Sequence, residues 1–280
     1  MVNTIMGKKV IFITGTSAGL GKITAEYLSK KGHIVIGTSR NAPSIDTIEV
    51  TKNQSYPLLV QMDVTDDTSI EKVLYFVQNQ FGRIDVLINN AGIGISGPVE
   101  ETPIDQAKMI FEINFFGMLK VTKKIIPLMR KRKKGLIINT SSIGGVIGLP
   151  YQGLYSATKF AIEGISEALR MELQGFGIRV VLVEPGDFKT SFTKNRKKIL
   201  DDSSPYSETV KKTTAVFEHD EQQGTDPIKL AYLMEKIMTS SHPKVRYRVG
   251  SFSQKFVASL KGVISDFILQ WILMKYYKLK

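Results

Sequence analysis

The 280-residue sequence contains no cysteine, which excludes disulfide bonds and thiolate metal sites. Its three histidines, His33, His219 and His242, lie far apart in the chain and lack the spacing of metal ligands, so we expect no metal site. The Met-Val-Asn-Thr start has no basic segment followed by a long apolar run, and we expect no secretory signal. These absences favour a cytoplasmic protein that works without a metal ion.

Acidic residues are in deficit, because 38 lysines and arginines outnumber 26 aspartates and glutamates and give a net charge of +12. Such a balance suits nucleic acid, an anionic membrane surface or anionic ligands. The densest basic run, residues 130–134, has no interleaved aromatic residues of the kind that stack on bases, and we expect it to form a solvated loop. We therefore expect no nucleic-acid partner.

Short apolar runs alternate with longer helical patterns along most of the chain, which predicts parallel strands joined by right-handed helical crossovers. The expected strands are residues 8–14, 33–39, 57–62, 84–89, 135–142, 177–185 and 244–250, and the expected helices are residues 20–31, 66–81, 103–130, 226–239 and the tail from 252. Residues 41–56 are expected to form a loop or a weak helix. We predict a single α/β domain over residues 1–280, with a Rossmann-type doubly wound parallel sheet, helices on both faces and a C-terminal helical extension.

A glycine-rich turn, TGTSAGLGK, follows the first expected strand and places Gly15, Gly19 and Gly21 before a helix. Glycines let the backbone come close to a pyrophosphate, and the helix N-terminus supplies free N–H groups and a positive dipole end. A tight turn without a ligand is the alternative. The second strand ends in Thr38-Ser39-Arg40, with no carboxylate to bond a ribose 2′-OH and an arginine that suits a 2′-phosphate. NADP(H) is therefore favoured over NAD(H), unless Arg40 only faces solvent.

Tyr155 and Lys159 stand four residues apart in YSATK, so on a helix they share one face, one turn apart. An ammonium at that distance would favour the phenolate and lower the tyrosine pKa from its usual value near ~10. This pair suits general acid–base catalysis. The alternative is a partly buried aromatic residue beside a surface lysine.

The glycine turn of the form TGxxxGxG, the sequence Asn89-Asn90-Ala91-Gly92, and a serine thirteen residues before the Tyr-xxx-Lys pair resemble the short-chain dehydrogenase/reductase family. The resemblance covers residues 14–190. It implies reversible hydride transfer between NADP(H) and an alcohol or carbonyl. Many NADP-preferring members carry a basic residue at the position of Ala18, which departs from that pattern.

By this resemblance, Tyr155 is the general acid/base, Lys159 lowers its pKa and holds the cofactor ribose, Ser142 bonds the substrate oxygen, and Ser141 points away. Asn114 would carry a proton relay. As a buried amide among phenylalanines, Asn114 needs a partner whatever its role, and a bulged helix is one solution.

The resemblance also implies the cofactor contacts. Asp63 and Val64 would contact adenine, although Asp63 is equally suited to cap the helix beginning near Thr65. The PGxxxT motif at 185–190 would hold the nicotinamide carboxamide. The full set of expected cofactor-binding residues is Gly15, Ser17, Gly19, Leu20, Gly21, Arg40, Asp63, Val64, Asn90, Ala91, Gly92, Tyr155, Lys159, Pro185, Gly186 and Thr190.

Two segments lie outside the family pattern. Residues 191–225 are polar and highly charged, without firm periodicity, and by resemblance form a substrate lid. Residues 252–280 have apolar residues at helical spacing, in runs too short to span a bilayer. Residues 255–280 are suited to contact a membrane surface, to pack over the pocket, or to pair with another subunit.

We therefore expect an NADP(H)-dependent oxidoreductase that interconverts a carbonyl and an alcohol, acts on a small-molecule substrate and assembles, as its relatives commonly do, as a homodimer or homotetramer. A reductase of lipid, steroid or retinoid carbonyls with a membrane-associating tail is an alternative. A dehydratase or epimerase and a non-catalytic NADP-binding sensor are further alternatives, but the glycine spacing disfavours the former and the intact Tyr–Lys pair the latter.

Overall fold

The computed structural model describes residues 7–48 and 55–279. The start considered for a secretory signal, part of the expected 41–56 segment and Lys280 lie outside the described residues.

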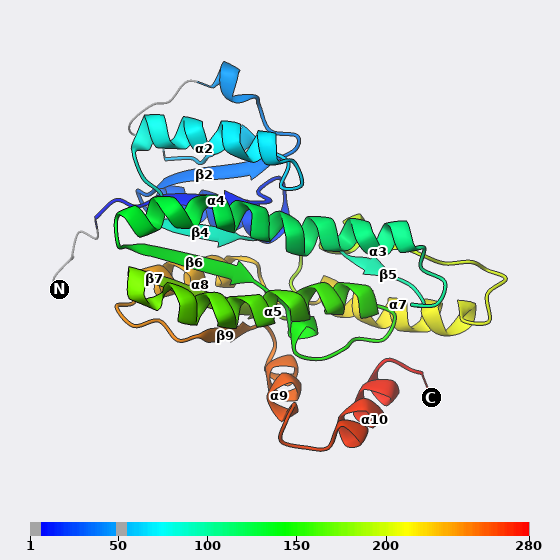
Figure 1. Cartoon of the computed structure of the whole chain (residues 1–280). Coiled ribbons are helices and arrows are strands. Elements are labelled where there is room, and N and C mark those ends of the chain that lie inside the picture. Colours follow the sequence, from blue (N-terminus) through cyan, green and yellow to red (C-terminus); the bar gives the residue numbers. More distant parts are fainter. Residues whose placement is uncertain (1–6, 49–54, 280) are drawn as a thin grey trace.

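The centre of the molecule is a seven-stranded sheet in which every pairing is parallel (Figure 1). The strand order is β3-β2-β1-β4-β6-β7-β9. The strands are β1 Val10–Thr14, β2 Ile34–Ser39, β3 Leu58–Gln61, β4 Val86–Asn89, β6 Gly135–Thr140, β7 Ile178–Pro185 and β9 Arg246–Val249. The order reverses between β1 and β4, and such a switch point is where α/β sheets bind ligands at their carboxyl edge. The predicted doubly wound Rossmann-type fold is confirmed.

Helices cover both faces of the sheet and bury a separate apolar core on each (Figure 1). On one face lie α2 Asp67–Phe81, α4 Gly117–Lys131 and α5 Gly153–Leu173, whose buried residues pack with those of the strands. On the other lie α1 Gly19–Lys30 and α8 Ile228–Thr239. Because both faces are covered, strands such as β1 are buried at every residue, which explains their unbroken apolar sequence.

The tract expected as one helix over 103–130 is interrupted. It consists of α3 Ile104–Phe111, a π-helical turn η2 Glu112–Phe116, and α4. Asn114 lies inside the π turn, which is the bulge considered from its sequence. The expected loop at 130–134 begins later than predicted, because Arg130 and Lys131 complete the last turn of α4, although all five basic residues are exposed.

The 191–225 segment was expected to be irregular, but it contains α6 Phe192–Asn195, the short strand β8 Lys197–Lys198 and the sixteen-residue helix α7 Ser207–Gln222. The strand β8 pairs in parallel with β5 Ile95–Ser96. The helix was missed because its buried face includes Thr213 and Glu221 beside Val210 and Phe217, so its apolar stripe is too weak to recognise.

The tail forms two helices, α9 Phe252–Leu260 and α10 Asp266–Tyr276, each capped by a serine side chain. They project below β9 in Figure 1. Ala258, Leu269 and Leu273 of these helices are buried against Ile143 and Ile147. Ile143 lies in the 3₁₀ turn η3 Ile143–Gly145, and Ile147 follows that turn. No helix in the described part of the chain has the length and apolar character to cross a bilayer. The short turns η1 Ile45–Thr47 and η4 Gln174–Phe176 complete the described elements.

Candidate active site

A cavity of about 660 Å³ lies at the carboxyl edge of the sheet. It runs past the ends of β1, β2, β4, β6 and β7, and residues of α7 and the tail also line it. Every residue predicted for catalysis or cofactor binding lines this cavity except Gly21 and Asn114. The sequence motifs, which are spread over 176 positions from Gly15 to Thr190, therefore converge on one site.

The glycine turn is built for close backbone approach. Gly15 has a φ of +73°, and a Cβ there would lie 2.6 Å from the Ala91 Cα, so only glycine fits. A Cβ at Gly21 would lie 2.2 Å from the Gly15 carbonyl oxygen, and Gly21 thus lets α1 pack against the turn without itself facing the cavity. Ala18, the N-cap of α1, has no side chain that caps the helix, so the first N–H groups stay available to an anion.

The two asparagines of the NNAG motif hold this edge of the sheet together. Asn90 Nδ2 donates to the carbonyl oxygens of Thr14 and Gly15, at 3.0 and 2.9 Å, and so fixes the glycine turn to the end of β4. Asn89 Nδ2 donates to Thr122 and Asn139, both at 2.8 Å, inside the core. Their side chains are therefore structural, while Ala91 and Gly92 continue the cavity wall.

The far end of the cavity lies at the ends of β2 and β3. Arg40 is exposed there, and the last residues of β2 carry no carboxylate. Asp63 lines the cavity and accepts hydrogen bonds from the Thr65 N–H and hydroxyl, at 2.9 and 2.8 Å. Asp63 does not cap α2, because Asp66 accepts from the Thr68 N–H and is the N-cap. The capping alternative for Asp63 is therefore wrong.

Ser142, Tyr155 and Lys159 meet on one wall of the cavity. Lys159 is buried, donates from Nζ to the Thr140 carbonyl at 3.0 Å, and lies 5.7 Å from the Tyr155 ring centroid. Ser142 Oγ accepts from the Gly144 N–H at 3.0 Å and donates to the Pro185 carbonyl at 3.5 Å. The neighbouring Ser141 hydroxyl is buried against Gly145.

Burial moves the two titratable groups of this wall in opposite directions. It raises the pKa of Tyr155 to about 12, and the contact with the Ser142 hydroxyl lowers it only in part. Burial lowers the pKa of Lys159 to about 8. The direction for Tyr155 is opposite to the one expected from the sequence, because desolvation of the phenol prevails and Lys159 Nζ is bonded to Thr140. At neutral pH the phenol is protonated.

Asn114 lies behind this wall. Its Oδ1 accepts from the Ile93 N–H at 2.8 Å, and its Nδ2 donates to the Ile93 carbonyl at 3.0 Å and to the Thr158 hydroxyl at 3.2 Å. The amide therefore ties the loop after β4 to the helix that carries Tyr155 and Lys159.

Sequence reasoning missed the residues at the other end of the cavity: Asp187, Phe192, Phe217, Glu221 and Tyr277. Only Asp187 falls within a motif, as the first variable position of PGxxxT. Arg196 is buried, forms an ion pair with Glu221, and lies over the rings of Phe217 and Phe192 at 4.6 and 5.4 Å. Apart from Asp187, these residues come from segments without family motifs, so no sequence signal identified them.

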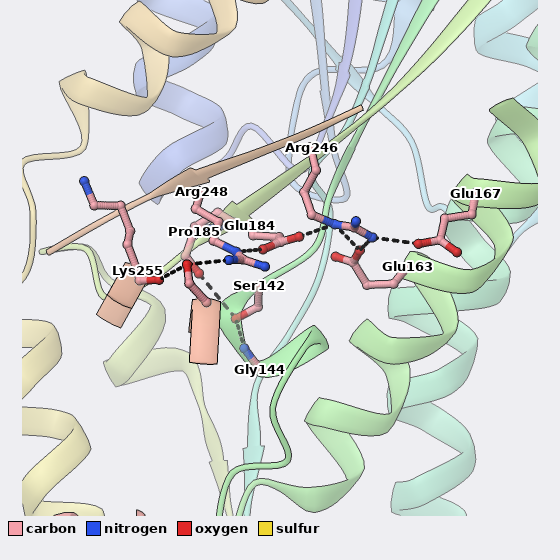
Figure 2. A network of polar contacts seen from close by, with 10 residues as sticks. Ser142, Gly144, Glu163, Glu167, Glu184, Pro185, Arg246, Arg248 and Lys255 are labelled. Atoms are coloured by element: carbon pink, nitrogen blue, oxygen red, sulfur yellow. Dashed lines mark hydrogen bonds and ion pairs between the residues drawn. The ribbon is translucent and has the colours of Figure 1, made fainter. Parts of the chain in front are cut away.

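A charged network lies beside Pro185 at the end of β7 (Figure 2). Glu184 is fully buried and forms ion pairs with Arg246 and Arg248 of β9. Arg248 also donates to Ser259 of α9 at 2.8 Å. This network joins the strand that ends beside Ser142 to the tail.

A parallel α/β sheet with a glycine turn and a Tyr–Lys pair at its carboxyl edge defines a dinucleotide-binding oxidoreductase. Residues 9–200 match the family described as short chain dehydrogenase. The chain belongs to this family.

Two curated relatives span nearly the whole chain. It is 42% identical over 277 residues to the 3-ketodihydrosphingosine reductase of Bacteroides thetaiotaomicron, covering 98% of this chain and 100% of that protein. It is 32% identical over 264 residues to the retinol dehydrogenase 8 of Homo sapiens, covering 92% of this chain and 78% of that protein. Both are oxidoreductases by name.

Solved structures agree. A short-chain dehydrogenase from Streptomyces avermitilis matches with a TM-score of 0.76 and 31% identity, covering 98% of this chain and 97% of that one. ElxO with NADP bound matches with a TM-score of 0.70 and 26% identity, covering 86% of this chain and 97% of that one. The protein is thus an oxidoreductase of the class that interconverts a CH–OH group and a carbonyl. Its similarity to NADP-bound structures supports a nicotinamide cofactor.

Proposed function

We propose that the protein is an NADP(H)-dependent carbonyl reductase in which Tyr155 delivers the proton. The observation that carries this proposal is the convergence of Ser142, Tyr155 and Lys159 on one wall of a cavity whose other end is a glycine turn.

The residues present fit NADP(H). Gly15 leaves room at the turn, the uncapped start of α1 suits a pyrophosphate, and Arg40 stands where a 2′-phosphate would lie. Lys159 would hold the ribose, and the Pro185-Gly186 and Thr190 region would hold the carboxamide. When bound, the cofactor supplies the hydride.

The protein's own groups handle the proton. The Tyr155 phenol is protonated at neutral pH and donates to the carbonyl oxygen, which is the state that a general acid needs for reduction. The Ser142 hydroxyl, turned toward the same cavity, bonds that oxygen and orients it. Asn114 keeps the helix that carries Tyr155 in place and stands behind Lys159 in the relay that would restore the proton. The segment 191–225 would act as the lid that excludes water.

A panel of carbonyl compounds tests this function by the loss of NADPH absorbance, with NADH as the comparison. We expect turnover with NADPH at a lower KM than with NADH, and a Tyr155→Phe variant about a thousandfold slower in kcat because the proton donor is lost. This variant should still bind NADPH, which fluorescence titration checks. Full activity of the variant contradicts the role of Tyr155, and tight NADPH binding without any turnover favours the sensor alternative.

A second candidate, a reductase of lipid-type carbonyls that touches a membrane, is favoured by the outer face of the tail. Phe252, Phe256, Val263, Phe267 and Trp271 are large apolar side chains exposed on α9, α10 and the turn between them. Lysines 255, 261 and 275 lie among them, a combination typical of helices that rest on anionic lipid. The names of both curated relatives point to lipid or retinoid substrates.

Co-sedimentation with vesicles tests the membrane contact. Binding to vesicles that contain anionic lipid should fall at least tenfold in a Phe267→Glu/Trp271→Glu variant, because two exposed apolar anchors become charged. Tyr75→Glu is the control, since Tyr75 is 73% exposed on α2, away from the tail. Equal binding of wild type and both variants contradicts the proposal, and a change of oligomeric state by light scattering instead assigns this face to a second copy.

We propose that the protein is a homodimer or homotetramer. The exposed apolar side chains of Phe160 and Met171 on α5 support this proposal.

A further inference from the structure

An acidic side chain stands at the reactive end of the cavity. Asp187 follows directly after Pro185-Gly186 and lines the cavity together with Ser142 and Tyr155. The charge of Asp187 contributes to the raised pKa of the Tyr155 phenol, which places the two groups within electrostatic reach of each other.

The tail holds this carboxylate in place. Gln254 Oε1 accepts from the Asp187 N–H at 3.0 Å, and Gln254 Nε2 donates to Asp187 Oδ2. Gln254 stands three residues after Ser251, the N-cap of α9, where such a side chain usually bonds back to its own helix. Here it is directed to Asp187 instead, so one carboxylate oxygen is fixed by an amide and the side chain is oriented in the cavity wall.

Among the residues that the structure describes, Asp187 has no direct cationic partner, because Arg196, the cation that acts on it electrostatically, is paired with Glu221. Glu221 is already paired with Arg196 and also accepts from the Thr193 hydroxyl. Asp220 accepts from the Tyr276 hydroxyl at 2.6 Å. In the described part of the chain no lysine or arginine forms an ion pair with Asp187. Burial, together with Glu221 and Asp220, accordingly raises the pKa of Asp187 to about 7.

We propose that Asp187 binds an ammonium group of the substrate beside the reacting carbonyl, so that the enzyme's preferred substrates are α-amino ketones. This inference rests on the proposed carbonyl reductase function. A chain with a net charge of +12 repels cations in general, so a carboxylate close to Tyr155 that forms no ion pair selects a cation at one position, whereas Glu221 on the same cavity is already paired with Arg196. An amino group on the carbon adjacent to the carbonyl brings the ammonium to Asp187 and the carbonyl oxygen to the Ser142–Tyr155 pair.

The similarity to 3-ketodihydrosphingosine reductase agrees with this chemistry, since the compound in that name carries an amino group next to its ketone. A shorter α-amino ketone would meet the same carboxylate.

The test compares two ketones and three proteins. The substrates are 3-ketodihydrosphingosine and the same long-chain ketone without its amino group, both in mixed detergent micelles with NADPH. The proteins are the wild type, Asp187→Asn, which keeps the shape but removes the charge, and Asp220→Asn, a neighbouring acid that does not line the cavity. We expect Asp187→Asn to lower kcat/KM about 100-fold for the amino ketone and less than threefold for the other, because only the former loses a charge-assisted bond. Asp220→Asn should change kcat/KM by less than threefold for both ketones.

Other results overturn the inference. An equal loss of kcat/KM for both ketones in Asp187→Asn assigns Asp187 to cofactor binding or to folding. An unchanged preference of Asp187→Asn for the amino ketone shows that the carboxylate charge does not select the substrate. If the wild type reduces neither ketone, the proposed function fails, and binding decides the inference separately. Dihydrosphingosine, the amino alcohol, should bind the protein with NADP⁺ present about 100-fold more weakly to Asp187→Asn than to the wild type, and equal affinity excludes an ammonium site.

Discussion

Lys159 shows how far burial changes the pKa of a side chain. Its pKa is lowered to about 8 by desolvation, with Glu163 acting weakly in the other direction. The helical spacing of Tyr155 and Lys159 revealed that they share a face, but it could not reveal that both would be buried. The position of each side chain was predictable from the motif, whereas its pKa depends on packing that no local pattern records.

The affinity for NADPH should depend on the charge of Lys159. The ammonium is the protonated form, so its charge is present below pH 8 and is lost as the pH rises through about 8. We expect the Kd for NADPH, from fluorescence titration, to rise about tenfold between pH 7 and 9.5, since one favourable charge near the ribose disappears. A Lys159→Met variant should bind weakly at all these pH values. A pH step of equal size in that variant would assign the titration to another group.

At the scale of elements, β9 and the tail support the end of the cavity that we propose for the substrate. Glu184 has no exposed surface and is balanced by two arginines of the edge strand. A buried carboxylate that loses one partner retains the other, but losing both leaves a charge without compensation.

A double-mutant cycle measures this arrangement. Arg246→Met and Arg248→Met should each lower the free energy of unfolding by about 1–2 kcal/mol, and the double variant by about 5 kcal/mol or more, which exceeds the sum of the two single losses. Urea unfolding followed by circular dichroism gives these values. Lys212→Met is the control, because its ion pair with Glu208 is exposed and should contribute little to stability. Strict additivity would mean that Glu184 is solvated or protonated once the arginines are gone.

The elements that the sequence predicted well are those with an uninterrupted apolar run or a strong stripe. All seven strands of the main sheet were expected close to their observed bounds, as was α8, where Asp226 accepts from the Ile228 N–H at 2.9 Å. The helix α7 was missed because its buried face includes polar side chains where apolar residues would be expected. The Thr213 hydroxyl, for example, donates a hydrogen bond to the Tyr277 carbonyl. Asp187 was missed as a site residue for a related reason, since its role depends on Gln254, 67 positions away.

On the scale of the whole molecule, the site has two halves of different origin. The residues expected to hold the cofactor lie within 9–200, the range that matches the family. Phe217, Glu221 and Tyr277, at the substrate end, lie beyond it. Removing the tail should therefore affect the two halves differently.

We expect deletion of residues 252–280 to leave NADPH affinity within about threefold, because within residues 7–48 and 55–279 no hydrogen bond or ion pair joins the glycine turn or Arg40 to the tail. Turnover should fall at least a hundredfold, since Gln254 and Tyr277 are lost and Ile143 and Ile147 beside Ser142 become exposed. Fluorescence titration and NADPH oxidation measure the two effects. Leu273→Ala, which trims the same contact, should lower the free energy of unfolding by about 2–4 kcal/mol with the fold retained. Loss of NADPH binding in the deletion variant would show that the halves are not separable.

The hydrogen bonds between Gln254 and Asp187 also determine the order in which the two ends of the cavity form during synthesis. Chains emerge from the ribosome N-terminus first, and the strands and helices of the cofactor half, including α8 that packs against α1, are complete by residue 239. The amide that orients Asp187, the arginines that balance Glu184, and Tyr277 are all translated afterwards. A nascent chain would therefore acquire a place for its nucleotide before it acquires the means to choose what to reduce.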